Sequence, residues 1–189
     1  YINRKQEPLG ICGWDKIRHY PPEYGSGSFC KTIWRSSAIE QGTWLLKEIG
    51  YYGFAAPELK KDPRDGKYKL IEINARTTLQ NRLAAACGVD IEYIAYLDIT
   101  GHNANKSVFP QNNVLWVDDF ADALSCLIHL KRHDIGILEI AKTLKARKVH
   151  SIMAWDDPIP FFARAIHLSL HVLCLLFSNL ISALRKLEG

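Results

Sequence analysis

The chain has 189 residues, of which 48% are hydrophobic and 23% charged, and its formal net charge is +4. This composition is ordinary for a globular protein, and a chain of this length buries a substantial core, with one domain as the default expectation. The basic residues are scattered, which argues against a nucleic-acid binder. The five cysteines form no Cys-x-x-Cys pair, which argues against a zinc site or a disulfide framework and favours a reducing, cytoplasmic compartment.

Strands are predicted near the N-terminus, at 2–4, 9–20 and 31–35. The loop between the last two, 21–28, is rich in Gly and Ser. It is either a flexible connection or a phosphate-facing loop, because Gly and Ser expose backbone N–H groups to anions. Lys16 and Arg18 lie just before this loop, and strand alternation places both on one face. From that face they could meet a triphosphate.

A helix is predicted next, over residues 38–49. Ser37 and Glu40 have the spacing of a capping box, and Gly50 supplies a helix stop. The apolar side chains of this segment form a broad stripe, which indicates a core-facing helix rather than a cofactor site.

A β-hairpin with arms at 54–60 and 68–74 is the most informative feature, because its turn, Asp-Pro-Arg-Asp-Gly, is built from turn residues. If the turn centres on Asp65, Glu58 lies opposite Glu72, and Asn74 shares a face with Glu72. Like charges in this position are destabilising unless something positive lies between them. Two carboxylates and an amide oxygen suit Mg²⁺ better than zinc.

A second interpretation of the hairpin stays open: it lies at the surface, and its charged residues are simply solvated. The segment 70–74, Leu-Ile-Glu-Ile-Asn, is expected to be buried on at least one face. Buried acids are rare unless they are paired or bound to metal, which favours the metal site. Arg76 follows at the strand exit, where it could reach an anionic group near the metal.

The remaining elements are four helices and two strands. Asp90 is expected to cap a helix. His129, His133 and His150 show no ligand spacing. Helices are predicted at 82–87, 90–98, 118–132 and 137–144, and strands at 114–117 and 149–155.

The C-terminal segment is strongly apolar over 161–184, and residues 165–184 contain no Asp, Glu, Lys or Arg. Three outcomes stay open for it. The helix could lie in a membrane interface, span a bilayer, or pack on protein. The protein is expected to be cytoplasmic. Residues 161–184 could give it a peripheral contact with the inner face of the membrane or a contact with another subunit.

The hairpin sequence carries a family resemblance. Residues 50–66, Gly-Tyr-Tyr-Gly-Phe-Ala-Ala-Pro-Glu-Leu-Lys-Lys-Asp-Pro-Arg-Asp-Gly, followed by Leu-Ile-Glu-Ile-Asn-Ala-Arg at 70–76, resemble the C-terminal catalytic part of ATP-grasp enzymes, in particular carboxylate–amine ligases. The resemblance runs from about residue 1 to 161. It implies an α+β fold, an antiparallel sheet with packed helices.

The resemblance also implies site residues. Glu58, Glu72 and Asn74 would hold Mg²⁺, with Mn²⁺ as an alternative, on the phosphates of ATP. Arg76 would bind a carboxylate or acyl phosphate, and Lys16 and Arg18 would lie at the nucleotide end. One departure is Ala75, where many relatives have Pro. In the family the stretch after Arg76 borders the acceptor site, so the resemblance makes Gln80 and Arg82 weaker candidates for substrate contact, with polar residues at a helix N-terminus as the alternative.

The implied reaction joins a small-molecule carboxylate to an amine through an acyl phosphate. We expect 1–155 to be the C-terminal part of an ATP-grasp domain and 156–189 to be an apolar amphipathic helix. The adenine pocket and the lid would lie in an N-terminal part that this chain lacks, so the fragment alone is expected to be inactive. Two alternatives stay open: a non-catalytic nucleotide-binding or scaffolding module, and an enzyme like biotin carboxylase or carbamoyl-phosphate synthase.

Overall fold

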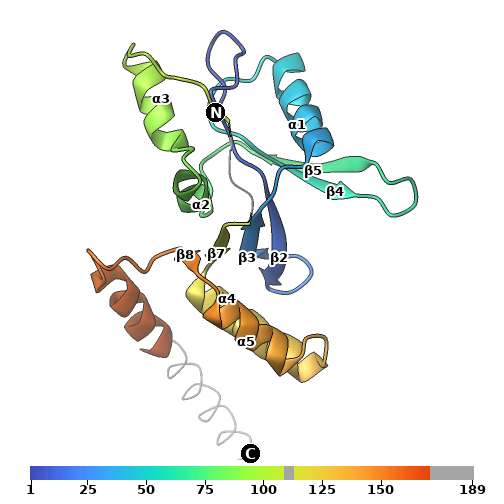
Figure 1. Ribbon diagram of the computed structural model, residues 1–189, viewed down its shortest axis with the longest axis vertical. Coiled ribbons are helices and arrows are strands. Elements are labelled where there is room, and N and C mark those ends of the chain that lie inside the picture. Colours follow the sequence, from blue (N-terminus) through green and yellow to red (C-terminus); the bar gives the residue numbers. More distant parts are fainter. Residues whose placement is uncertain (109–112, 171–189) are drawn as a thin grey trace, which may run out of the picture. The chain divides into compact units, whose positions relative to one another are not determined.

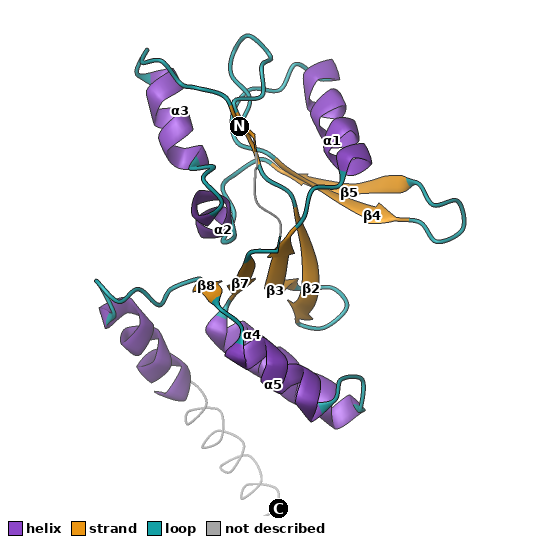
Figure 2. Cartoon of the chain, viewed as in Figure 1, coloured by secondary structure: helices purple, strands orange, loops and turns teal. Residues whose placement is uncertain are grey.

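The computed structural model describes residues 1–108 and 113–170, and the chain divides into two compact units, Tyr1–Ser151 and Ile152–Gly189. The first unit contains every named helix and strand (Figure 1). Its described residues combine helices with mainly antiparallel strand pairs, as Figure 2 shows, which agrees with the predicted α+β class. The ATP-grasp fold itself stays a prediction.

A four-stranded sheet forms the centre of the first unit, in the order β2-β3-β7-β8. The first three strands pair antiparallel, and β8 pairs parallel to β7. Apolar residues of the sheet and of α2 form a buried cluster of Cys30, Leu83 and Trp116. The bounds are β2 Trp14–Tyr20, β3 Ser26–Thr32, β7 Leu115–Val117, β8 Lys148–His150 and α2 Asn81–Ala86.

Two helices follow the third strand of this sheet, α4 (Asp119–Arg132) and α5 (Ile137–Lys145). Asp118 caps α4 by accepting a hydrogen bond from the Ala121 N–H. Helix α4 packs on β2 and β3. The ion pair between Arg18 of β2 and Asp122 of α4 forms at this contact.

The hairpin consists of β4 (Ala56–Lys61) and β5 (Tyr68–Asn74), and α1 (Ser36–Glu48) lies against it (Figure 1). The backbone of α1 runs close to β4 here, since a Cβ at Gly42 would lie in ordinary van der Waals contact with the Pro57 ring, at 3.5 Å. At the hairpin turn, Gly66 has a φ of +69°, a conformation that glycine adopts without strain.

A second core lies near the N-terminus. It gathers residues from the segments 1–9 and 87–89 and from α3 (Ile91–Ile99). Asp90 caps α3, as predicted, by accepting a hydrogen bond from the Tyr93 N–H. The short strands β1 (Gly10–Ile11) and β6 (Ser107–Val108) pair parallel beside it. Its buried members are Tyr1, Leu9, Cys87, Val89, Ile94 and Ala95.

Three local predictions were wrong. The expected loop 21–28 is a shorter turn, because residues 26–28 belong to β3 and pair with β2. A Cβ at Gly27 would lie 2.7 Å from the Cys30 sulfur, so close packing, not flexibility, explains this glycine. The capping box at Ser37 is absent: α1 begins at Ser36, and its N-cap, Arg35, makes no side-chain capping bond.

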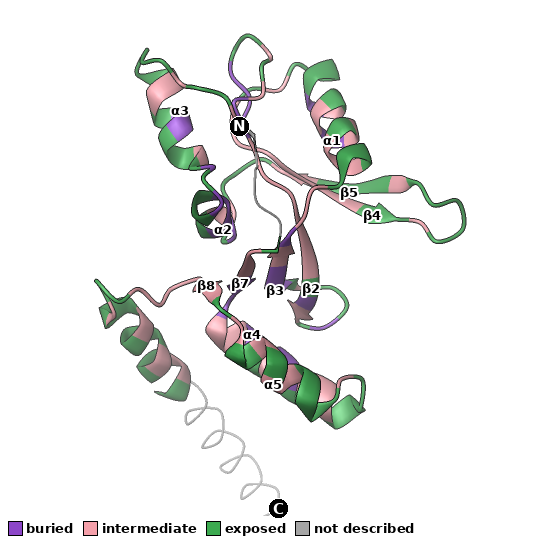
Figure 3. Ribbon diagram, in the orientation of Figure 1, coloured by how far each residue is buried: buried purple, intermediate pink, exposed green. Residues whose placement is uncertain are grey.

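The third wrong prediction concerns burial of the segment 70–74. Leu70 is 41% exposed and Ile71 61% exposed, and Glu72 is also exposed. Figure 3 shows exposed and half-exposed residues along both strands of the hairpin. Glu72 is therefore not a buried acid, and its burial gives no reason to expect a metal beside it.

The second unit is described only as far as residue 170, with helical residues at 159–170. Several apolar side chains there are exposed, including Ile159, Phe162 and Ile166. Among the residues that the structure describes, no helix is long and apolar enough to cross a membrane. The predicted helix 161–184 continues beyond the described residues, so its membrane or subunit contact stays a prediction.

Candidate functional site

The strand register brings the two predicted acidic ligands together. Glu58 of β4 pairs directly with Glu72 of β5, and Ala56 pairs with Asn74. A register irregularity lies immediately after Glu58. The opposition of the two glutamates, predicted from the turn, is therefore present in the hairpin.

Hydrogen bonds tie Asn74 to both glutamates. Its Nδ2 donates to Glu72 Oε1 at 2.8 Å and to Glu58 Oε1 at 3.3 Å. The assignment of the amide nitrogen and oxygen follows the hydrogen-bond network, and the opposite orientation would present Oδ1 to a cation. The three side chains thus form one cluster, called here the carboxylate cluster: Glu58, Glu72 and Asn74.

A lysine from the central sheet joins the carboxylate cluster. The Lys16 ammonium lies 2.5 Å from Glu58 Oε2, and the two side chains are 25% and 30% exposed. This contact places a positive charge beside one of the two opposed carboxylates, that of Glu58. Lys16 was predicted at the nucleotide end, and the structure places it beside the predicted metal ligands.

Arg18 lies elsewhere, although alternation predicted that it shares a face with Lys16. The β2–β3 pairing is irregular on both sides of Arg18, between Lys16 and Arg18 and again between Arg18 and His19, so the strict alternation fails there. The Arg18 side chain is 3% exposed, and its guanidinium lies 4.3 Å from the Phe29 ring centroid. The prediction that the two cations act on one face is wrong.

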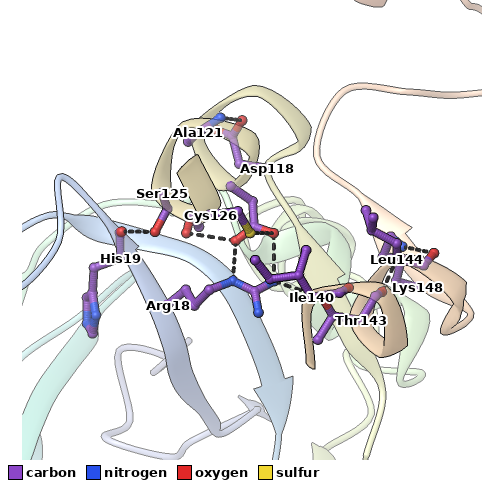
Figure 4. A network of polar contacts seen from close by, with 12 residues as sticks. Arg18, His19, Asp118, Ala121, Ser125, Cys126, Ile140, Thr143, Leu144 and Lys148 are labelled. Atoms are coloured by element: carbon purple, nitrogen blue, oxygen red, sulfur yellow. Dashed lines mark hydrogen bonds and ion pairs between the residues drawn. The ribbon is translucent and has the colours of Figure 1, made fainter. Parts of the chain in front are cut away.

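The partner of Arg18 is Asp122 of α4. Nε donates to Oδ1 at 2.8 Å and Nη2 to Oδ2 at 2.7 Å, a bidentate pair. Ser28 adds a hydrogen bond to Asp122 at 3.1 Å, and Thr143 of α5 accepts one from Arg18 at 3.3 Å. Figure 4 shows Arg18 and Thr143 in this network. These contacts assign Arg18 to packing between the sheet and its helices, and they do not favour a role at the nucleotide.

His19 is a neighbour of the carboxylate cluster that the sequence did not single out. Burial lowers its pKa, the positive charge of Lys16 lowers it further, and Glu58 opposes this by raising it. No spacing signal could have identified His19, because its position depends on the irregular pairing of β2. A neutral imidazole is therefore favoured beside the cluster.

Arg76 lies just beyond β5, and its guanidinium is exposed. Its one hydrogen bond within the described ranges goes to the Thr77 carbonyl at 3.1 Å. Gln80 is buried instead and donates to the Gly27 carbonyl at 3.2 Å, so it fastens the segment after β5 to β3. Of these two substrate candidates, Arg76 has the freedom to meet a ligand, whereas Gln80 has a structural contact.

The donor chemistry of the carboxylate cluster fits Mg²⁺. Its two carboxylates and one amide offer only hard oxygen ligands. The side chains that the structure describes contain no group of three or more His, Cys, Asp or Glu residues placed to hold a metal ion. A cation here would therefore depend on two glutamates, one amide and further oxygens from a substrate.

Comparisons with known proteins add one short similarity. A D-aspartate ligase from Enterococcus faecium (strain Aus0004) is 59% identical over 32 residues, which are 17% of this chain and 8% of that protein. No family model and no solved structure matches the chain. The matched stretch is too short to establish a family.

Proposed function

We propose that this chain carries the metal–nucleotide end of an ATP-dependent ligase that joins a carboxylate to an amine through an acyl phosphate. The observation that carries the proposal is the register of Glu58 against Glu72, with Asn74 bonded to both. The short similarity to a D-aspartate ligase supports the ligase class. The substrates are small molecules, with ATP and Mg²⁺ as cofactors.

The roles of the side chains follow from their charges and positions. Glu58, Glu72 and Asn74 would hold Mg²⁺, which when bound neutralises charge on the ATP phosphates. Lys16 balances Glu58 and could turn to a phosphate oxygen, since its side chain is partly exposed. Arg76 offers a planar guanidinium that can bind a carboxylate or an acyl phosphate in a bidentate manner.

The test is Mg²⁺-dependent ADP release by the full-length protein. ATP would be supplied with D-aspartate and with a pool of carboxylates and amines, and ADP would be followed by a coupled assay. Glu72→Gln keeps the shape of the side chain and removes its charge. The matched control is Glu48→Gln, which changes an exposed glutamate of α1 outside the carboxylate cluster.

The proposal predicts ADP release that depends on substrate, that is lost in Glu72→Gln and that is kept in Glu48→Gln. Equal release by the wild type and Glu72→Gln would contradict it. A folded protein that binds ATP without releasing ADP from any substrate pair would favour a non-catalytic nucleotide-binding module instead.

A further inference from the structure

Helix α5 carries an exposed apolar stripe that the carboxylate cluster does not include. Ile137, Ala141 and Leu144 follow one another at the i, i+4, i+7 spacing that places side chains on one helix face. Ile137 is 74% exposed and Leu144 is 68% exposed, and the adjacent Leu138 is 79% exposed. No residue of α5 is fully buried, and Figure 3 shows exposed residues along this helix. Three large aliphatic side chains of one short helix therefore face solvent.

Positive charge borders the apolar stripe. Leu138, Lys142 and Lys145 form the neighbouring stripe at the same spacing. Arg147 and Lys148 follow directly after the helix, and the stretch from Lys142 to Lys148 contains no acid. Among the described residues, no acidic side chain forms a salt bridge with any of these four cations. The apolar stripe is thus flanked by cationic groups that no carboxylate neutralises.

The opposite side of α5 holds the helix on the first unit. Arg18 of β2 donates a hydrogen bond to Thr143 Oγ1 at 3.3 Å, and Ile140 is half-buried on this side. Lys148 Nζ donates to the carbonyls of Thr143 and Leu144 at 3.0 and 2.8 Å, which satisfies the C-terminal end of the helix. The exposed face is therefore already formed, and binding to it does not require the helix to fold first.

The composition of this face favours lipid over protein as the partner. Protein interfaces are enriched in aromatic residues, Met and Arg and are depleted in Lys. Helix α5 contains no aromatic residue, no Met and no Arg, and it has two lysines. An aliphatic face bordered by lysines is typical of helices that lie in a membrane interface, because the lysine stems reach the phosphates while the apolar side chains enter the acyl boundary. A cluster of four basic residues adds attraction to anionic lipids.

We propose that α5 docks the protein on an anionic lipid surface, with Ile137, Leu138 and Leu144 below the headgroups and Lys142 and Lys145 on lipid phosphates. The helix lies in the plane of the surface, because its length of about 14 Å is half the thickness of a hydrocarbon core. The contact does not depend on the proposed ligase activity. It is also separate from the predicted membrane contact of residues 161–184, so the test is confined to changes in α5.

Vesicle co-sedimentation of the full-length protein tests the proposal. One set of vesicles contains equal parts of phosphatidylcholine and phosphatidylglycerol, and the other contains phosphatidylcholine alone. The wild type should bind the anionic vesicles at least about tenfold more tightly than the neutral ones, because each lysine near an anionic surface strengthens binding about fivefold. Added salt should weaken binding to the anionic vesicles, since it screens this attraction.

Two double variants connect the binding to α5. One removes the charges of the lysine pair, Lys142→Gln with Lys145→Gln, and the other removes apolar surface, Leu138→Gln with Leu144→Gln. Each should weaken binding to the anionic vesicles at least about tenfold. All four side chains are exposed, so thermal unfolding followed by circular dichroism should show the wild-type melting temperature.

Matched control variants make the same chemical changes on other surfaces and should keep vesicle binding. The charge control removes two exposed lysines of the hairpin, and the apolar control removes two aliphatic side chains that are 62% and 65% exposed. These variants are Lys60→Gln with Lys61→Gln, and Leu79→Gln with Ile99→Gln.

Three results would overturn the proposal. They are the absence of vesicle binding by the folded protein, equal binding to the anionic and the neutral vesicles, and equal binding by the wild type and the lysine double variant. Analytical ultracentrifugation without lipid examines a second copy of the chain as the alternative occupant. Self-association that Leu138→Gln with Leu144→Gln abolishes, together with unchanged vesicle binding by that variant, would assign the face to a dimer and overturn the lipid contact.

Discussion

Removing Asp122 should destabilise the fold strongly, because its partner Arg18 would remain buried without a counter-charge. The two side chains are 8% and 3% exposed and share two hydrogen bonds of 2.8 and 2.7 Å. Breaking a buried pair from one side costs about 3–5 kcal/mol. A domain of ordinary stability has about 5–15 kcal/mol in total, so Asp122→Ala should lose a large part of it.

Urea unfolding followed by circular dichroism would measure this loss. The control is Asp65→Ala, which breaks the exposed pair with Lys69 and should cost no more than about 1 kcal/mol. The double variant Arg18→Leu, Asp122→Leu should cost less than the sum of the single changes, since apolar pairs often replace buried ion pairs without loss. A cost below about 1 kcal/mol for Asp122→Ala would refute a structural role for this pair.

Three further predictions concern the carboxylate cluster and its neighbours. Without metal, Glu72→Gln should raise the free energy of unfolding by about 0.2–1 kcal/mol in urea, because it removes a like-charge pair with Glu58; a loss of stability would contradict this. Arg76→Lys should reduce ligase turnover without changing the melting temperature, because a point charge replaces a bidentate donor on an exposed residue; unchanged turnover would count against its assigned role. The pKa of His19 is lowered in the folded protein, so as the pH falls below about 6.5 the unfolded chain binds this proton more readily than the folded one, and the free energy of unfolding decreases. In urea unfolding at several pH values, His19→Gln should show a smaller decrease. A pH profile identical to that of the wild type would argue against His19 as the cause.

The hairpin could be predicted because its determinants are local. The turn residues 62–66 and the alternation on either side set the register, and the opposition of Glu58 and Glu72 follows from counting. The start of helix α3 could also be predicted, since the Asp90 side chain caps it. In both cases the signals lie within a few residues of the feature that they determine.

Features that depend on distant contacts could not be predicted. Because the pairing of β2 is irregular, Lys16 contacts Glu58, whereas Arg18 contacts Asp122. Arg18 and Asp122 are 104 residues apart in the sequence. The end of the Gly-rich segment, residues 26–28, belongs to β3, where Gly27 fits against Cys30, and composition alone does not reveal this contact. The exposure of the segment 70–74 could not be predicted either, since an apolar strand has the same sequence pattern whether or not another element covers it.

The most direct test of the central claim is metal binding at the carboxylate cluster. Mn²⁺ is a suitable paramagnetic substitute for Mg²⁺, and electron paramagnetic resonance would measure its binding to the full-length protein in the presence of ATP. Mn²⁺ should bind to the wild type and be displaced by Mg²⁺. Glu72→Gln should lose this binding, and Glu48→Gln should keep it. Equal Mn²⁺ binding by the wild type and Glu72→Gln would contradict the assignment of Glu58, Glu72 and Asn74 as the metal site.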